Sequence, residues 1–146
     1  MAKTYKIYTA GKMGGLTYSQ QTDWRLKIEK LIKGRTSANV VFIHPPLFYR
    51  YGENLHKSES ETMEWDLSQI RTSDIVVVDF KNISDSIGTH IELGFIKAIN
   101  EFGNKHIFVI GIGKPNIDHP WLSLIPLRQE DTVESAAEYI STYLLN

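Results

Sequence analysis

Residues 74–79 read Asp74-Ile75-Val76-Val77-Val78-Asp79, a continuous apolar run between two aspartates. Such a run predicts a strand covered on both faces, as in a parallel sheet flanked by helices. Asp74 is typical of a cap or turn, whereas Asp79, at the carboxyl end of the strand, is expected to face a ligand crevice. This stretch therefore indicates the centre of an α/β fold.

Segments of strand type and of helix type alternate on either side of this run. Strands are predicted at 5–10, 39–43 and 106–112, and Pro126 makes a short fifth strand at 124–127 doubtful. Apolar residues at helical spacing predict helices over 19–33, around Met63, Leu67 and Ile70, and over 91–102 and 133–144. We therefore predict one domain over 1–146, a flavodoxin-like (Rossmann-like) three-layer α/β sandwich. Its central parallel sheet would have four to five strands in the order 2-1-3-4-5.

Composition excludes several classes of function. Hydrophobic residues make up 42% of the 146 residues and charged residues 23%, values that are ordinary for a globular protein. The absence of cysteine excludes disulfides and thiolate metal sites, and a net charge of -1 provides no basic field for a nucleic-acid polymer. We find no signal-peptide pattern and no apolar run long enough to span a bilayer, so a cytoplasmic protein without membrane partners is expected. The five histidines show no metal spacing and are interpreted as surface or loop residues, so no metal or cofactor is predicted.

Ligands of such sheets bind beyond the carboxyl ends of the strands, where the strand order reverses. The loops that flank this point are predicted at 11–15 and 80–89. The first, Gly11-Lys12-Met13-Gly14-Gly15, brings backbone close to a ligand or is a simple turn, and it matches neither the P-loop nor the dinucleotide fingerprint. The long stretch 44–61 between a strand and a helix is predicted to be an irregular, functional loop. Its Tyr49 and Tyr51, and Trp121 further on, are candidates to stack on a base, although Trp121 suits a core position equally.

The segment 85–89 is predicted to open the third helix, where free N–H groups favour an anion. Glu92 follows within the first turn or so, and the helix dipole is expected to favour its ionised form, as a nucleophile requires. An alternative stays open, because Thr89-His90-Ile91-Glu92 also matches a capping box with Thr89 as the N-cap. Asp66 borders the apolar stripe of its helix. A carboxylate there either has a partner or a functional role, or it lies at the edge of the stripe with access to solvent.

These segments together resemble the nucleoside 2-deoxyribosyltransferase family, from Ile7 to about Ile110. The resemblance rests on residues 8–11 (Tyr-Thr-Ala-Gly), 64–67 (Glu-Trp-Asp-Leu) before 73–77 (Ser-Asp-Ile-Val-Val), and 86–94 (Ser-Ile-Gly-Thr-His-Ile-Glu-Leu-Gly). The family places its nucleophilic glutamate before a leucine-glycine pair, which implies that Glu92 attacks the anomeric carbon. By the same resemblance Asp66 handles the base and its proton, and Tyr8 positions the nucleophile or the sugar.

The family also contains hydrolases of deoxynucleoside 5′-monophosphates. Typical transferases carry an aspartate six residues before the glutamate, whereas these hydrolases carry a serine that holds the phosphate. Here that position is Ser86, directly after Asp85. The family's members are oligomers, which implies a homo-oligomer in which a neighbouring subunit completes the site.

The expected function is cleavage of the N-glycosidic bond of a (2′-deoxy)nucleoside or nucleotide through a covalent glycosyl-glutamate, with transfer of deoxyribose to a free base in nucleotide salvage. The alternatives are hydrolysis of 5′-monophosphates and a non-catalytic module that senses a nucleotide. Catalytic roles are predicted for Glu92, Asp66 and Tyr8. Substrate binding is predicted for Gly11, Lys12, Gly14, Asp85, Ser86, Gly88 and Thr89.

Overall fold

The computed structural model describes residues 2–49 and 56–145, and the structural statements below concern these residues. They form a five-stranded, wholly parallel sheet with the strand order β2-β1-β3-β4-β5. The strands are β1 (Thr4–Ala10), β2 (Asn39–Ile43), β3 (Ile75–Asp79), β4 (Phe108–Ile112) and β5 (Arg128–Glu130). The predicted flavodoxin-like architecture and strand order are therefore confirmed.

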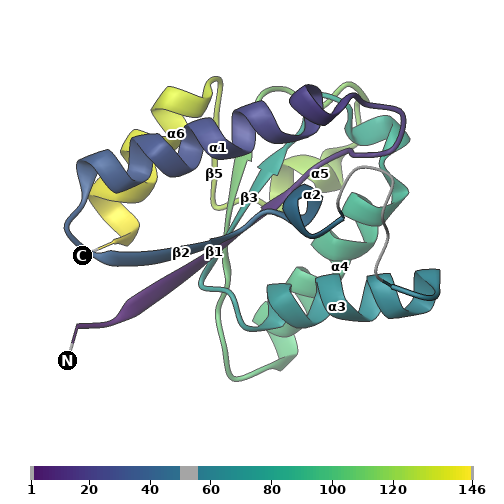
Figure 1. Ribbon diagram of the computed structural model, residues 1–146, viewed down its shortest axis with the longest axis horizontal. Helices are drawn as coiled ribbons and strands as arrows, with labels where there is room; N and C mark the ends of the chain where they lie inside the picture. Colours follow the sequence, from purple (N-terminus) through teal and green to yellow (C-terminus); the bar gives the residue numbers. More distant parts are fainter. Residues whose placement is uncertain (1, 50–55, 146) are drawn as a thin grey trace.

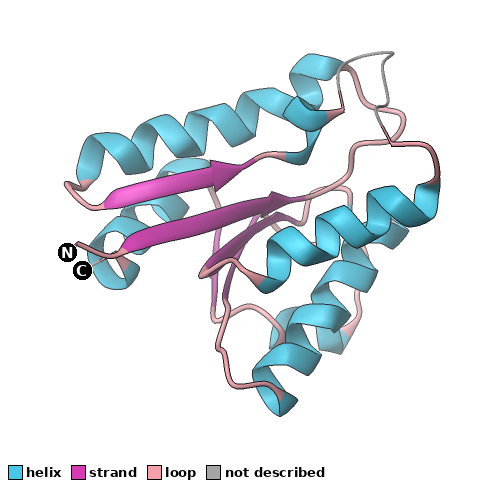
Figure 2. Cartoon of the chain, turned by 60° about the horizontal axis from the view of Figure 1, so that its bottom comes forward, coloured by secondary structure: helices cyan, strands magenta, loops and turns pink. Residues whose placement is uncertain are grey.

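Helices cover both faces of the sheet, as Figures 1 and 2 show. One face carries α1 (Tyr18–Arg35), α6 (Val133–Tyr139) and a π-helix (Ile140–Leu144). The other face carries α3 (Glu59–Arg71), α4 (Ile87–Phe102) and α5 (Pro120–Leu124). The short α2 (Pro45–Phe48) follows β2, and a 3-10 helix (Ile83–Asp85) precedes α4. No helix in these two ranges has the length and apolar character to cross a membrane.

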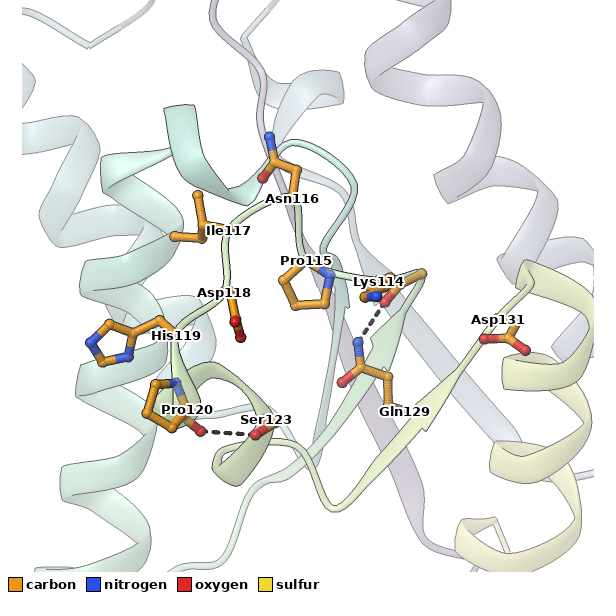
Figure 3. A pocket seen from close by; sticks show the side chains of 11 residues that line it. Lys114, Pro115, Asn116, Ile117, Asp118, His119, Pro120, Ser123, Gln129 and Asp131 are labelled. Atoms are coloured by element: carbon orange, nitrogen blue, oxygen red, sulfur yellow. Dashed lines mark hydrogen bonds between the residues drawn. The ribbon is translucent and has the colours of Figure 1, made fainter.

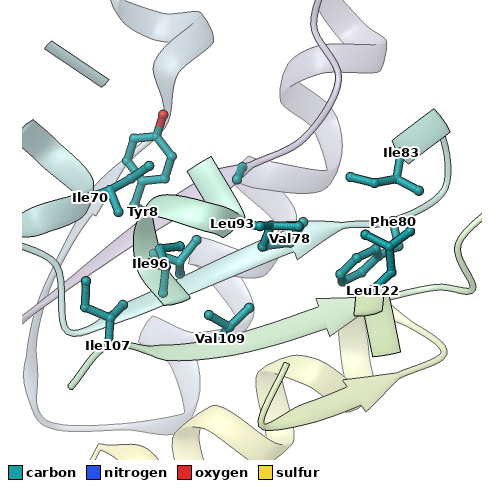
Figure 4. Packing of buried hydrophobic residues seen from close by; sticks show 12 residues of the cluster. Tyr8, Ile70, Val78, Phe80, Ile83, Leu93, Ile96, Ile107, Val109 and Leu122 are labelled. Carbon is teal, nitrogen blue, oxygen red and sulfur yellow. The ribbon is translucent and has the colours of Figure 1, made fainter. Parts of the chain in front are cut away.

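Each face of the sheet has its own apolar core, because successive residues of a strand point to opposite faces. On β1, Ile7 packs with α1 and α6, whereas Tyr8 and Ala10 pack with α3, α4 and α5. Figure 4 shows the Tyr8 ring in this second core, with its hydroxyl group directed away from the apolar side chains. The pleat of β1 thus directs a polar group toward the helices that carry the candidate carboxylates.

Local chemistry explains where several helices begin. Thr17 and Gln20 form a capping box at the start of α1, because the Thr17 side chain accepts from Gln20 N and the Gln20 side chain accepts from Thr17 N. Pro45 and Pro120 are the first residues of α2 and α5, where their fixed φ fits a helix and their missing N–H is not needed. Both short helices were absent from the sequence prediction, since their two and three apolar positions show no clear period.

Two predicted elements differ from the structure. The fifth strand lies at Arg128–Glu130 rather than at 124–127, because α5 extends to Leu124 and Pro126 has no N–H for a strand ladder. The buried face of α4 is formed by Thr89, Leu93 and Ile96, whereas Ile91 is half exposed and Phe102 is 85% exposed. Apolar residues occur on several faces of α4, so their spacing did not identify the buried one.

Candidate active site

The candidate site lies at the carboxyl edge of the sheet, between β1 and β3, where the strand order reverses. The chain leaves β1 toward α1 and β2 on one side, and it leaves β3 toward α4 and β4 on the other. The loops after β1 and β3 therefore flank this point, as predicted.

Tyr8 and Glu92 meet at this edge. The Tyr8 hydroxyl donates a hydrogen bond to Glu92 Oε2 at 2.7 Å, and the Tyr8 side chain is buried. The pKa of Glu92 is raised to about 7: burial is the largest cause and Asp66 also raises it, whereas the Tyr8 hydrogen bond and Arg25 lower it. Burial, with the Glu92 charge next, raises the pKa of Tyr8 well above its usual value, so Tyr8 stays a hydrogen-bond donor.

Asp66 lies on α3 and lines the same cavity as Glu92, which has a volume of about 300 Å³. The two carboxylates therefore approach each other across a crevice, as expected. Tyr49 donates a hydrogen bond to Asp66 Oδ1 at 2.6 Å, and burial raises the pKa of Asp66 above its usual value. Asp66 is partly buried and has a hydrogen-bonded partner, so it differs from a carboxylate that is simply solvated at a helix edge.

A second cavity of about 140 Å³ shares Asp66 and Gly88 with the first. Its lining also includes Tyr8, Gly11 and Arg25, so this cavity extends the site to the carboxyl end of β1. Gly88 lines both cavities, and a Cβ atom at Gly88 would meet nothing within 4 Å. Gly11 is closely surrounded, since a Cβ atom there would lie 3.3 Å from both Asp79 and Trp24.

The start of α4 corrects the capping-box interpretation. The helix begins at Ile87 with Ser86 as its N-cap, so Thr89 is the third helical residue and Glu92 lies in the second turn. The Thr89 hydroxyl is buried and pairs with Ser86 Oγ at 2.6 Å, and Glu92 accepts from Tyr8 instead of from a helix-terminal N–H. The helix dipole acts mainly within the first turn, and burial raises the pKa of Glu92, so the expected preference for the ionised form was wrong.

Lys12 and Asp85, both predicted to bind substrate, contact each other. Lys12 Nζ lies 3.4 Å from Asp85 Oδ2, and the Asp85 side chain is mostly exposed. This ion pair joins the loop after β1 to the 3-10 helix before α4. Gly14 is exposed and is not among the residues that line the two cavities.

Arg25 was missed by the sequence prediction. It lies on α1 at helical spacing from the buried Ile28 and Ile32, and its side chain is 0% exposed. Its electrostatic partners include Tyr8, Glu92 and Asp66. The signal was an arginine on the core-facing stripe of a helix, where an isolated charge is costly.

Some other predicted residues lie elsewhere or differ in environment. His44 lies between β2 and α2, outside the regular elements as expected, but it is buried, and its ring is hydrogen-bonded to Thr9 and Glu29. Trp121 is 72% exposed, which excludes the core position that was one of its two alternatives. Tyr51 lies outside the described residues. Over 2–49 and 56–145, the structure contains no cluster of three His, Asp or Glu residues suited to a metal ion.

A larger cavity of about 700 Å³ lies beyond the carboxyl end of β4, and Figure 3 shows its lining. Its walls come from residues 113–120, Ser123, Gln129 and Asp131, and Gln129 Nε2 donates to Gly113 O. None of the predicted site residues lines it. The chemistry of the carboxylates, rather than cavity size, therefore identifies the candidate site.

The fold is shared with two solved 2-deoxyribosyltransferases. The enzyme from Bacillus psychrosaccharolyticus superposes with a TM-score of 0.63 at 18% identity, over 94% of this chain and 91% of that chain. The enzyme from Leishmania mexicana superposes with a TM-score of 0.61 at 18% identity, over 97% of this chain and 99% of that chain. No protein-family model and no curated protein matches the chain significantly. The chain therefore has the α/β fold of the 2-deoxyribosyltransferases, in agreement with the resemblance in its sequence.

Proposed function

We propose that this protein is an enzyme that cleaves the N-glycosidic bond of a 2′-deoxynucleoside and transfers the deoxyribose to another base. The observation that carries the proposal is the arrangement of Glu92, which accepts a hydrogen bond from Tyr8 and shares a cavity with Asp66. The fold shared with two 2-deoxyribosyltransferases supports it.

In the proposed mechanism Glu92 attacks the anomeric carbon through its carboxylate. The bond from this carbon to the base nitrogen breaks, and the departing base keeps the electron pair. The transition state resembles an oxocarbenium ion, as in retaining glycosidases, and a covalent glycosyl-glutamate forms. A second base then displaces Glu92, or water does so in a hydrolase. No metal or organic cofactor takes part.

Asp66 supplies the proton that the departing base needs. Burial raises the pKa of Asp66 above its usual value, which makes this carboxyl group easier to protonate than a solvated aspartate. Tyr49 holds one carboxyl oxygen at 2.6 Å and thereby orients the group. Tyr8 fixes the nucleophile in the same way from β1, so both reacting carboxyl groups are oriented by a tyrosine hydroxyl.

The deciding experiment measures base release from a panel of deoxynucleosides and their 5′-monophosphates, with and without a free acceptor base. Glu92→Gln keeps the shape and can still accept from Tyr8, so it removes only the negative charge. We expect a loss of several orders of magnitude in turnover with the fold and ligand binding retained. Glu101→Gln, an exposed change on the same helix, is the matched control.

Activity of Glu92→Gln within about tenfold of wild type would exclude the nucleophile role, since a tenfold change is only about 1.4 kcal/mol of barrier. A wild-type protein that binds nucleotides but releases no base from any substrate would instead support the non-catalytic module.

Hydrolysis of deoxynucleoside 5′-monophosphates is a second candidate, and Ser86 favours it. Ser86 is the N-cap of α4 but makes no side-chain cap, so the first N–H groups of the helix are not capped by it. Such groups favour a phosphate. In this case a 5′-monophosphate binds more tightly than its nucleoside, and added salt weakens the preference. Equal affinities in a titration favour the transferase.

A further inference from the structure

Arg25 is the largest fully buried side chain among the described residues, and all its hydrogen bonds go to neutral oxygens. Its Nε donates to Thr9 Oγ1 at 3.2 Å, Nη1 to Gln21 O at 2.5 Å and Nη2 to Gly11 O at 3.2 Å. In the described chain no carboxylate forms a direct ion pair with it. Burying a guanidinium without a carboxylate partner destabilises the folded state, so the charge of Arg25 is expected to have a function.

The position of Arg25 connects the two faces of the sheet. It comes from α1, on the Ile7 face, and reaches the Gly11 carbonyl at the end of β1. There it lines the smaller cavity together with Tyr8 and Asp66. Its side chain has no exposed surface, so it acts on the carboxylates through space instead of contacting a ligand.

A series of hydrogen-bonded side chains supports the guanidinium of Arg25. Thr9 Oγ1 lies 2.8 Å from His44 Nδ1, and His44 Nε2 lies 2.7 Å from Glu29 Oε1. We call Thr9, His44 and Glu29 the polar chain. Burial lowers the pKa of His44, so its ring is neutral at pH 7. With Nε2 protonated, every donor points from Arg25 toward Glu29, and each contact is satisfied.

We propose that Arg25 is a positioning residue of this site: its buried guanidinium, anchored by the polar chain, favours the carboxylate form of Glu92 over the protonated form. This inference rests on the proposed function, because it concerns the same nucleophile. Two partly buried carboxylates that line one cavity oppose each other's ionisation, and a nearby cation offsets that effect. The pKa of Arg25 is lowered by burial to about 10, so the guanidinium keeps its charge at neutral pH.

Several other titratable groups interact electrostatically with Arg25 or with Glu92. They are Tyr8 on β1, His44 after β2, Tyr49 after α2, Asp66 on α3 and Asp79 at the end of β3. Among these neighbours Arg25 supplies the permanent positive charge, since the His44 ring is neutral at pH 7.

The test measures the titration of Glu92 directly, by NMR of ¹³C-labelled glutamate carboxyl groups, with Glu92→Gln used to assign the signal. In Arg25→Met the Glu92 midpoint should rise by about one pH unit or more, the usual effect of losing an opposite charge. Arg25→Lys keeps a charge and should restore most of the shift. Arg35→Met, at the exposed end of the same helix, is the matched control and should leave the midpoint unchanged.

The pH profile of base release gives the functional readout. A rise of one unit in the Glu92 midpoint lowers activity at pH 7 by about fivefold and leaves it nearly unchanged at pH 9. An unchanged Glu92 midpoint in folded Arg25→Met overturns the inference, whether or not the protein releases bases. If base release is absent although the midpoint rises, the inference stands and the proposed function fails.

The double variant Arg25→Met/Glu92→Gln decides the case in which Arg25→Met does not fold. Recovery of the fold in the double variant supports the charge coupling, because removing Glu92 relieves the excess negative charge. A double variant as unfolded as Arg25→Met overturns it and assigns Arg25 a purely structural role.

Discussion

At the scale of single residues, Glu92 is under opposing influences. Burial and Asp66 disfavour its charge, whereas the Tyr8 hydroxyl and Arg25 favour it, and the balance puts its pKa at about 7. A carboxylate in this range is a stronger nucleophile than a fully solvated one and is still half ionised at neutral pH. Burial also raises the pKa of Asp66, while the hydrogen bond from Tyr49 favours its charged form, so the two carboxyl groups of one cavity have different partners.

Tyr8→Phe removes the hydroxyl that holds Glu92 and leaves the buried ring. The pKa of Glu92 should then rise above 7, because a hydrogen bond to the charged form is lost. We expect the acid limb of kcat/KM, near pH 7 in wild type, to move upward, with a loss of about 10- to 100-fold at pH 7. Steady-state kinetics from pH 5 to 9 measure both effects. An unshifted limb would show that Tyr8 does not act through Glu92.

Glu92 should also make stability depend on pH. Its folded-state pKa is raised from 4.5 to about 7, so the folded state binds more protons than the unfolded state between these values. The stabilising contribution is complete below pH 4.5 and is lost as the pH rises through 7. Glu92→Gln should therefore raise the melting temperature at pH 8 relative to wild type more than at pH 5. Equal differences at both pH values would contradict the raised pKa.

At the scale of elements, the start of α4 determines the site. The helix begins two residues before the predicted N-cap Thr89, which moves Glu92 from the first turn into the second and directs it toward Tyr8. Ser86 and Thr89 bond to each other through their hydroxyls, so neither forms a conventional cap. Residues 89–92 therefore match the capping-box pattern in sequence but do not form a capping box in the structure.

Close packing between β4 and the residue after β3 gives a test of the fold. A Cβ atom at Gly111 would lie 2.5 Å from the ring of Phe80, which is fully buried. Gly111→Ala should cost about 1–3 kcal/mol in the free energy of unfolding, because the ring has no room to move. Urea unfolding measures this value.

The control for this change is Gly94→Ala, within α4, where a Cβ atom would meet nothing within 4 Å. It should stabilise the protein by about 0.5–1 kcal/mol, since alanine is the better helix former. A Gly111→Ala variant as stable as Gly94→Ala would contradict the packing of Phe80.

At the scale of the whole molecule, the groove between α4 and α5 exposes apolar side chains. It has a volume of about 310 Å³; Trp121 in its wall is 72% exposed, and Leu124 nearby on α5 is 76% exposed. Exposed apolar surface of this kind often marks a protein interface. We therefore propose that this groove is an interface between copies of the chain in the homo-oligomer that the sequence resemblance implies.

The double variant Trp121→Ser/Leu124→Ser should shift the protein to a smaller species in sedimentation velocity, because both side chains leave the proposed interface. Leu26→Ser, an exposed change on α1 at the opposite face of the sheet, should have no effect. A wild type that sediments as a monomer, or a double variant that sediments like wild type, would exclude this interface.

The alternation of strand and helix patterns by itself determined the parallel sheet with helices on both faces, because local periodicity and the handedness of crossovers apply to any chain of this pattern. The order 2-1-3-4-5, and with it the crevice between β1 and β3, was one of the common orders that this pattern allows, and the tertiary structure confirmed it. The residues Tyr8, Asp66 and Glu92 were also identified as candidates from sequence, through their resemblance to a family motif.

Only the tertiary structure decided the partners of these residues and their charge states. Arg25 joins the site because α1 packs along β1, a contact between segments whose spacing in sequence carries no signal. The raised pKa of Glu92 arises mainly from burial, with Asp66 as a neighbouring charge, which the helix dipole argument could not anticipate. Desolvation and through-space charge depend on three-dimensional distance, and distance between residues far apart in the chain exists only once the chain has folded.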